Sequence, residues 1–236
     1  MAYGTLFLIP VPLADEAAAQ SFTPYLVDTI NSVKEYIVEN EKTARRFLKL
    51  AGLKTPQSEL VIHDYGKHNR DAGLKEFFKG LVVGKDVGLM SEAGCPGIAD
   101  PGADIVAEAH RKGIKVVPLV GPSSILLALM ASGFNGQSFT FHGYLPIDKL
   151  ERSKSIKELE SLAEKNKQTQ LFIETPFRND SMLQEILRSC KPNTRLCIAC
   201  DITAPTEFIK TMTIGEWLKQ VPDLRKRPAI FLIFHS

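Results

Sequence analysis

The sequence predicts an α/β protein with two α/β domains, a mainly parallel N-terminal sheet and a mixed C-terminal sheet. In the first half, short apolar segments alternate with helical patterns, which is typical of βαβ units and a parallel sheet. In the second half strand-like segments dominate, and only the short turn Thr203–Pro205 separates two of them, which indicates an antiparallel hairpin. A chain of 236 residues suits two small domains or one large domain. We place the boundary near Val120, giving domains 1–119 and 120–236.

The expected strands of the first domain are short and rich in Val, Ile and Leu: Thr5–Ile9, Lys34–Glu39, Leu60–His63, Val87–Met90 and Lys115–Val120. Helical patterns lie between them: Lys42–Leu50, Leu74–Val82 and Ile105–Lys112. For the last of these, Asp100 is expected to cap the helix, Pro101 to occupy its first turn and Gly113 to follow its end. Ser123–Ser132 predicts a further helix that Gly133 closes.

The second domain is expected to contain these strands: Phe139–Tyr144, Thr169–Ile173, Arg195–Ile202, Thr206–Thr211 and Ala229–Phe234. Three helical patterns interrupt them: Arg152–Lys165, Ser181–Cys190 and Glu216–Gln220. A mixed sheet follows from this order of elements.

Composition favours an ordinary cytoplasmic enzyme. The formal net charge is only +2, which neither indicates a nucleic-acid binder nor excludes a local basic face. No apolar stretch approaches the ~18 residues of a membrane helix. The apolar run Leu6–Leu13 lacks a preceding basic residue and contains two prolines, so we interpret it as a strand that enters a loop rather than as a signal segment.

The Cys197-x-x-Cys200 pair is a weak metal signal. It lies in an expected strand, where residues three apart point to opposite faces, and no second pair completes four ligands. The five histidines show no metal-like spacing either, so we expect no metal site. Dinucleotide, P-loop and nucleophile-elbow motifs are absent from the sequence.

The segment Ser91–Gly102 is the strongest functional signal. It follows a buried strand, opens a helix and is dense in Gly and Pro, which fix an irregular backbone that another molecule can approach closely. Ligands usually dock at the carboxyl ends of strands in such sheets. An ordinary βα turn needs only about two to six residues, so we interpret this longer segment as a binding loop. A second segment, Gly121-Pro122-Ser123-Ser124, also joins a strand to a helix, and by itself is a weaker signal.

Together these segments resemble a known family. The chain is similar to the tetrapyrrole methylase superfamily, and in particular to its branch of bacterial small-subunit ribosomal RNA ribose 2′-O-methyltransferases. The matching stretches are Gly4–Ile9 with Pro12, Glu92–Gly102, Gly121–Ser124, Phe139–Pro146 and Ile173–Arg178. The resemblance covers nearly the whole chain.

The resemblance implies a methyltransferase that binds S-adenosylmethionine (SAM) in a cleft between the domains, needs no metal and forms a homodimer. The residues implied to contact SAM are Pro12, Gly94, Cys95, Pro96, Gly97, Ile98, Ser123, Ser124, Glu174 and Ala229. A sulfonium suits carbonyl oxygens and apolar walls rather than a phosphate cradle. Its charge activates the methyl group, so catalysis reduces to alignment and removal of a proton.

The loops expected to meet the acceptor depart from the pattern of the branch. Val11–Asp15 stands where the branch has Thr-Pro-Ile-Gly-Asn, Val38–Lys42 where it has Ala-Glu-Asp-Thr-Arg, and Cys200–Ala204 where it has Arg-Glu-Leu-Thr-Lys. Three hypotheses therefore stay open: an RNA methyltransferase, a methyltransferase for a small tetrapyrrole-like molecule, and a protein that binds SAM without turnover.

Glu92 and Arg178 are the candidate catalytic residues, because both lie on loops that flank the expected cleft. A ribose hydroxyl has a high pKa and needs a base, or a cation that stabilises the forming oxyanion. A surface salt bridge or a helix cap explains the two residues equally well. For an RNA acceptor, two basic groups are candidates for tracking phosphates: Lys149, Arg152, Lys154 and Lys157, and Lys67, His68, Asn69 and Arg70. A solvated helix face is the alternative interpretation.

Overall fold

The computed structural model describes residues 2–66 and 74–235. By its internal contacts the chain divides into two compact units, residues 1–123 and 124–236. The domains 1–119 and 120–236, with a cofactor cleft between them, stay a prediction. In the described part of the chain, no helix is both long and apolar enough to cross a membrane.

The first unit is built on a parallel sheet of five strands in the order β3-β2-β4-β1-β5. The strands are β1 (Thr5–Leu8), β2 (Glu35–Val38), β3 (Val61–Asp64), β4 (Val87–Met90) and β5 (Lys115–Pro118). β2 and β4 are buried along their whole length, as their continuous apolar sequences predict. All five predicted strands of this half are confirmed.

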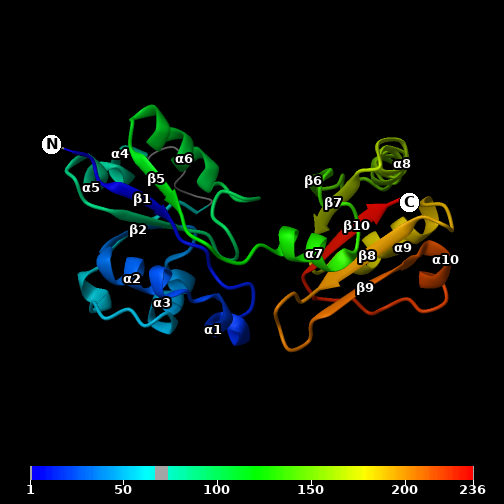
Figure 1. Ribbon diagram of the computed structural model, residues 1–236, viewed down its shortest axis with the longest axis horizontal. Coiled ribbons are helices and arrows are strands. Elements are labelled where there is room, and N and C mark those ends of the chain that lie inside the picture. Colours follow the sequence, from blue (N-terminus) through cyan, green and yellow to red (C-terminus); the bar gives the residue numbers. More distant parts are fainter. Residues whose placement is uncertain (1, 67–73, 236) are drawn as a thin grey trace. The chain divides into compact units, whose positions relative to one another are not determined.

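Helices cover both faces of this sheet (Figure 1). One face packs against α2 (Pro24–Ser32) and α3 (Glu41–Leu50), and the other against α4 (Leu74–Phe77), α5 (Lys79–Val82) and α6 (Gly102–Arg111). Short helices η1 (Asp15–Ala17), α1 (Ala18–Ser21) and η2 (Gln57–Glu59) complete the unit.

Besides the short helices η1, α1 and η2, which the sequence does not predict, the helices differ from the prediction in two places. The single helix predicted over Leu74–Val82 is two short helices, and in the second the Cα of Gly80 approaches the Glu35 carboxylate so closely that a Cβ there would lie 2.2 Å from Oε2. Helix α2 has no counterpart in the prediction, although Thr23 caps it by accepting a hydrogen bond from the Leu26 N–H at 3.1 Å.

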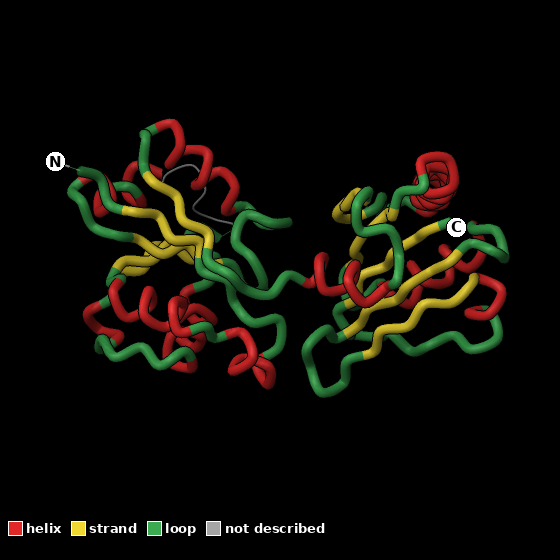
Figure 2. Tube along the Cα trace, viewed as in Figure 1, coloured by secondary structure: helices red, strands yellow, loops and turns green. Residues whose placement is uncertain are grey.

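The second unit has a mixed sheet of five strands in the order β6-β7-β10-β8-β9. Figure 2 shows the strands of this sheet in yellow, with helices in red beside them. The strands are β6 (Phe139–Tyr144), β7 (Thr169–Glu174), β8 (Arg195–Cys200), β9 (Phe208–Thr213) and β10 (Ala229–Phe234). β6 and β7 are parallel, whereas β10 runs antiparallel to β7 and β8, and β8 to β9. The predicted hairpin is confirmed as β8 and β9.

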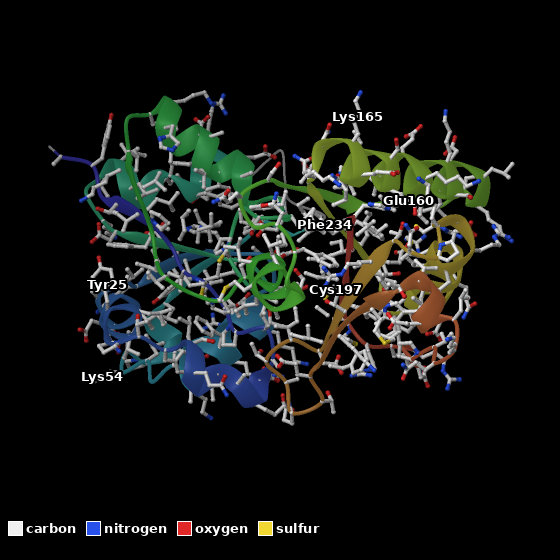
Figure 3. All side chains as sticks on the ribbon, turned by 45° about the vertical axis from the view of Figure 1, so that its right-hand side comes forward. Tyr25, Lys54, Glu160, Lys165, Cys197 and Phe234 are labelled. Atoms are coloured by element: carbon white, nitrogen blue, oxygen red, sulfur yellow. The ribbon has the colours of Figure 1, made fainter. Side chains whose placement is uncertain are left out.

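One face of the second sheet shares its core with α8 (Lys149–Asn166), α9 (Asn179–Ser189) and α10 (Ile214–Trp217). Along α8, Lys165 is exposed, whereas Glu160 is buried and accepts a hydrogen bond from the Lys191 N–H at 2.7 Å (Figure 3). Helix α7 (Ser124–Ser132) packs on the other face, where the Thr211 hydroxyl donates to the Ser132 carbonyl at 2.8 Å.

The two cysteines of the C-x-x-C pair are buried free thiols on β8. Cys200 belongs to the core beneath α8 and α9, and Cys197 points to the alternate face. Burial raises the pKa of each thiol to about 11. Both side chains are therefore packing residues, as their position in a strand predicts.

Candidate functional site

Three loops meet at the carboxyl edge of the first sheet, because β4, β1 and β5 are parallel neighbours. The loop after β1 is joined to the loop after β4 by two hydrogen bonds, from Val11 N–H to Gly94 O at 2.9 Å and from Gly94 N–H to Val11 O at 2.8 Å. The loop after β5 packs on the first loop at Gly121, where a Cβ would lie 2.1 Å from Cγ of Pro10. Pro12, Gly94–Ile98 and Ser123 thus belong to one connected group of loops.

The loop after β4 is held in a fixed, irregular conformation. Gly94 and Gly97 have φ of +73° and +81°, and Ala99 has φ of +61°. The Asp100 carboxylate accepts hydrogen bonds from Gly97 N–H at 2.9 Å and from Gly102 N–H at 2.6 Å. The prediction that Asp100 is the N-cap residue of the following helix is wrong, because Pro101 holds that position before α6. The Asp100 carboxylate still accepts from the first N–H of α6, at Gly102, and it also binds Gly97 within the loop.

Three backbone donors of this loop are engaged within the first unit. The N–H groups of Gly94, Gly97 and Ile98 donate to Val11 O, the Asp100 carboxylate and Cys95 O. A loop that cradles phosphate needs such N–H groups to point outward. These three are instead bonded to the protein, and the loop carries the exposed apolar side chain of Ile98 next to the buried Pro96.

Cys95 joins the loop after β4 to the loop after β5. Its thiol lies 3.3 Å from the Pro122 carbonyl oxygen, which it can reach as a donor, and partial burial raises its pKa. Ser123 ends the first unit, and Ser124 is the first residue of α7 in the second. Both serines are half-buried.

The predicted residues of the second unit meet at the end of β7. Glu174 and Ala229 are direct partners in the β7–β10 ladder. The Glu174 carboxylate is buried: its Oε1 accepts from Thr175 N–H at 2.6 Å and from Arg178 Nη2 at 2.6 Å, whereas its Oε2 has no hydrogen-bond partner. A buried carboxylate oxygen without a donor is costly, so this atom is suited to a hydroxyl or amine of a ligand.

The two candidate catalytic residues have different surroundings. Glu92 is exposed on the loop after β4, and its backbone N–H donates to Oε2 of Glu39 at 3.2 Å. Arg178 is one-third exposed and binds Oε1 of Glu174 through Nε and Nη2. Glu92 belongs to the first unit and Arg178 to the second, so their relation to a common acceptor stays a prediction.

A cavity of about 310 Å³ lies beside these loops within the first unit. Its walls come from the loop after β1, from α3 and from the start of the loop after β4: Val11, Pro12, Leu13, Ala14, Asp15, Thr43, Arg46, Phe47, Leu50, Glu92 and Ala93. Of these, Pro12 and Glu92 are site residues that the sequence predicts, whereas the α3 residues are not. The signal that could have found them is the amphipathic spacing of the predicted helix Lys42–Leu50.

The basic stretch of the second unit is partly a structural feature. Arg152 is buried and its Nη1 donates to the Ile147 carbonyl at 3.0 Å, so its predicted contact with phosphate is wrong. Lys154 is exposed beside Glu158. The other predicted group, Lys67, His68, Asn69 and Arg70, lies outside the described residues. Within residues 2–66 and 74–235, no three His, Cys, Asp or Glu side chains are grouped to hold a metal ion.

Comparison with known proteins connects this geometry to one family. Residues 11–217 match the tetrapyrrole (corrin/porphyrin) methylases. The chain is 29% identical over 234 residues to the ribosomal RNA small subunit methyltransferase I of Vibrio cholerae, with 98% of this chain and 77% of the relative aligned. It is 35% identical over 175 residues to the protein of the same name in Bacillus subtilis, where the alignment spans 74% of this chain but only 56% of the relative.

Solved structures agree on the fold. The methyltransferase CobJ superposes with a TM-score of 0.63 at 17% identity, covering 100% of this chain and 95% of that chain. A uroporphyrin III C-methyltransferase from Thermus thermophilus gives 0.60 at 16% identity, with 98% of each chain covered. The match over residues 11–217 runs from the loop after β1 to the end of α10, so it includes strands β2 to β9 and the loops after β4 and β5. The chain therefore belongs to the tetrapyrrole methylase family.

Proposed function

We propose that this protein is a SAM-dependent methyltransferase that acts on RNA, with a ribose 2′-hydroxyl of ribosomal RNA as the acceptor. Membership of the methylase family supports the reaction type. The name ribosomal RNA small subunit methyltransferase I, which the relatives in Vibrio and Bacillus carry, supports the acceptor. A cytoplasmic homodimer completes the proposal.

The observation that carries the cofactor assignment is the internal use of the N–H groups in the loop after β4. With the N–H groups of Gly94, Gly97 and Ile98 engaged, these donors are not offered to an anion, and the exposed Ile98 gives apolar surface to a ligand. This environment suits a sulfonium and an adenosine better than an anion. The positive φ of Gly94 and Gly97 fits the same assignment, because a side chain in this conformation is strained.

The proposal assigns SAM to Pro12, Gly94–Ile98 and Ser123 of the first unit, and to Ser124, Glu174 and Ala229 of the second. The buried Oε2 of Glu174 lacks a donor, and an amine or hydroxyl of the bound cofactor would satisfy it. When bound, SAM supplies a methyl group that its positive sulfur already activates. The remaining tasks, orientation and proton removal, fall to the protein.

Glu92 is proposed as the base that removes the acceptor proton, because its side chain is exposed and lines the cavity beside the loop. Arg178 is proposed to stabilise negative charge on the acceptor oxygen. Its bonds to Glu174 fix Nε and Nη2, and its partial exposure leaves the guanidinium accessible.

Methyl transfer from labelled SAM tests the proposal. The acceptors are ribosomal particles and RNA from cells that lack the protein, and a tetrapyrrole mixture is the parallel arm. We expect label in the RNA alone, at a ribose in nuclease digests. Label in the tetrapyrrole arm would replace RNA with a small acceptor.

Calorimetry with metal-free protein complements this assay. We expect SAM and its demethylated product to bind at low-millimolar affinity or tighter. SAM binding with no transfer to any acceptor would indicate a binding protein without turnover. The absence of both would overturn the proposal.

A further inference from the structure

The cavity of the first unit has the size and lining of a small ligand site. Its volume of about 310 Å³ lies at the lower end of the range for such pockets. Seven of the eleven residues around it are apolar: Val11, Pro12, Leu13, Ala14, Phe47, Leu50 and Ala93. Walls of this kind suit the faces of a planar ring system. The cavity also shares Pro12 and Glu92 with the loops already assigned to cofactor and catalysis.

Helix α3 contributes two neighbouring rows of side chains at this place. Thr43, Arg46, Phe47 and Leu50 line the cavity, with the spacing of one helix face. Lys42, Arg46 and Lys49 are spaced by four and three residues, so they form a second row along the adjacent face. Arg46 belongs to both rows, and all three cations are exposed.

Among the described residues, the cation that borders the cavity has one ion-pair partner, and that pair is exposed. Arg46 pairs with Asp15, and the two side chains are 66% and 65% exposed. Such pairs contribute little to stability, so a competing anion can replace Asp15 at small cost. In the described part of the chain, Lys42 and Lys49 have no salt bridge that would compete with such an anion.

We propose that the cavity receives a nucleobase of single-stranded RNA, and that Arg46 exchanges Asp15 for a phosphate of the same strand. Lys42 and Lys49 extend the path of the backbone along α3. A base can enter a protein cavity only when it is out of the helical stack, and a single strand offers such a base without the cost of unpairing it from a duplex. This inference rests on the proposed function, and it states how the protein recognises the RNA that accepts the methyl group.

Two substitutions separate recognition from a structural role. Arg46→Ala and Asp15→Asn both abolish the ion pair, so a structural role predicts the same effect for both. The proposal predicts opposite effects on RNA binding. Arg46→Ala removes the guanidinium that would bind the phosphate, whereas Asp15→Asn frees that guanidinium from its ion pair. Arg111→Ala is the matched control: Arg111 is 70% exposed and pairs with Glu108 at 2.7 Å, on α6 at the other face of the sheet.

The measurement is binding of a short single-stranded RNA of mixed sequence to the full chain at several salt concentrations, with the same RNA as a duplex for comparison. Loss of one phosphate contact lowers the slope of log K against log salt by roughly 0.7, and weakens binding about fourfold near 0.15 M salt. We expect this for Arg46→Ala, tighter binding for Asp15→Asn, and no change for Arg111→Ala. The wild type should prefer the single strand.

Equal binding by Arg46→Ala and Arg111→Ala, a common direction for Arg46→Ala and Asp15→Asn, or preference for the duplex would each overturn the inference. Two further measurements on the wild type accompany the RNA-binding experiment: calorimetry with SAM, and methyl transfer to ribosomal RNA. If these succeed while the RNA-binding results fail, the proposed function stands and only the role of the cavity is wrong. If these fail, the proposed function itself is at fault.

Discussion

Replacement of Gly97 by Val should reduce SAM binding without unfolding the protein. Gly97 has φ of +81°, and the nearest atom to a Cβ placed there is the Ala103 backbone nitrogen at 3.8 Å. The substitution therefore meets no steric obstacle, and its cost is the left-handed conformation. For a β-branched residue that cost is about 2 kcal/mol.

This conformational strain can lower either the stability of the protein or its affinity for SAM. If the loop keeps its conformation, the free energy of unfolding falls by about 2 kcal/mol and SAM affinity is retained. If the loop relaxes, the binding-competent fraction falls to at most roughly one in 30 and the apparent Kd rises up to about 30-fold, less the cost of the bonds that relaxation breaks. We expect part of the energy to appear in this second way, because the bond that relaxation must break is the Gly97 hydrogen bond to Asp100.

Gly113→Val is the matched control. Gly113 has φ of +70° and no atom within 4 Å of a Cβ placed there, and it lies after the C-terminal end of α6, whereas the loop joins the N-terminal end of that helix. Its variant should lose about 2 kcal/mol in urea unfolding and bind SAM normally. If the two variants bind SAM equally well in calorimetry, the loop after β4 is not the cofactor loop.

Glu92→Gln should lower methyl transfer at neutral pH about 100-fold while SAM affinity stays within a few-fold; unchanged turnover in a quench assay would exclude Glu92 as the base. Arg178→Ala should reduce methyl transfer more than SAM binding. It should also lower the free energy of unfolding by about 2 kcal/mol, because buried Glu174 loses its cation. Arg178→Lys should restore part of this stability in urea unfolding. Burial raises the pKa of Cys197 and Cys200 from 9.0 to about 11, so the stabilisation of their neutral thiols is present below pH 9 and lost as the pH rises to about 11. Urea midpoints across that range should fall, and fall less in Cys197→Ala.

The strands are more predictable from the sequence than the helices. The predicted strand Val87–Met90 has the bounds of β4, because a strand buried on both faces is a continuous apolar run bounded by polar residues. Helix α2 escapes prediction despite its Thr23-Pro24 start, since only Leu26, Thr29 and Ile30 of its nine residues are buried. A short helix with so narrow an apolar face leaves a weak periodic signal.

The candidate site is predictable where it depends on one loop. Gly and Pro in the segment Ser91–Gly102 predict an irregular backbone, and Gly94 and Gly97 do have positive φ. The role of Asp100 is not predictable, because the local order Asp-Pro-Gly fits a helix cap as well as it fits the observed bonds within the loop. The helix spacing within Lys42–Leu50 is a local signal for one wall of the cavity, but the assembly of its walls is not predictable, because they lie far apart along the chain, from Val11 to Ala93.

The contact of Gly121 with the ring of Pro10 has a consequence for protein engineering and for divergence. A Cβ at position 121 would lie 2.1 Å from Cγ of Pro10, so Gly121 cannot be replaced while Pro10 stays in place. A chimera whose imported segment after β5 has a residue other than glycine at this position would introduce an atomic overlap unless the segment after β1 is imported with it. Grafts and randomised libraries should therefore transfer positions 10 and 121 as one unit, and natural lineages are expected to exchange them in concert.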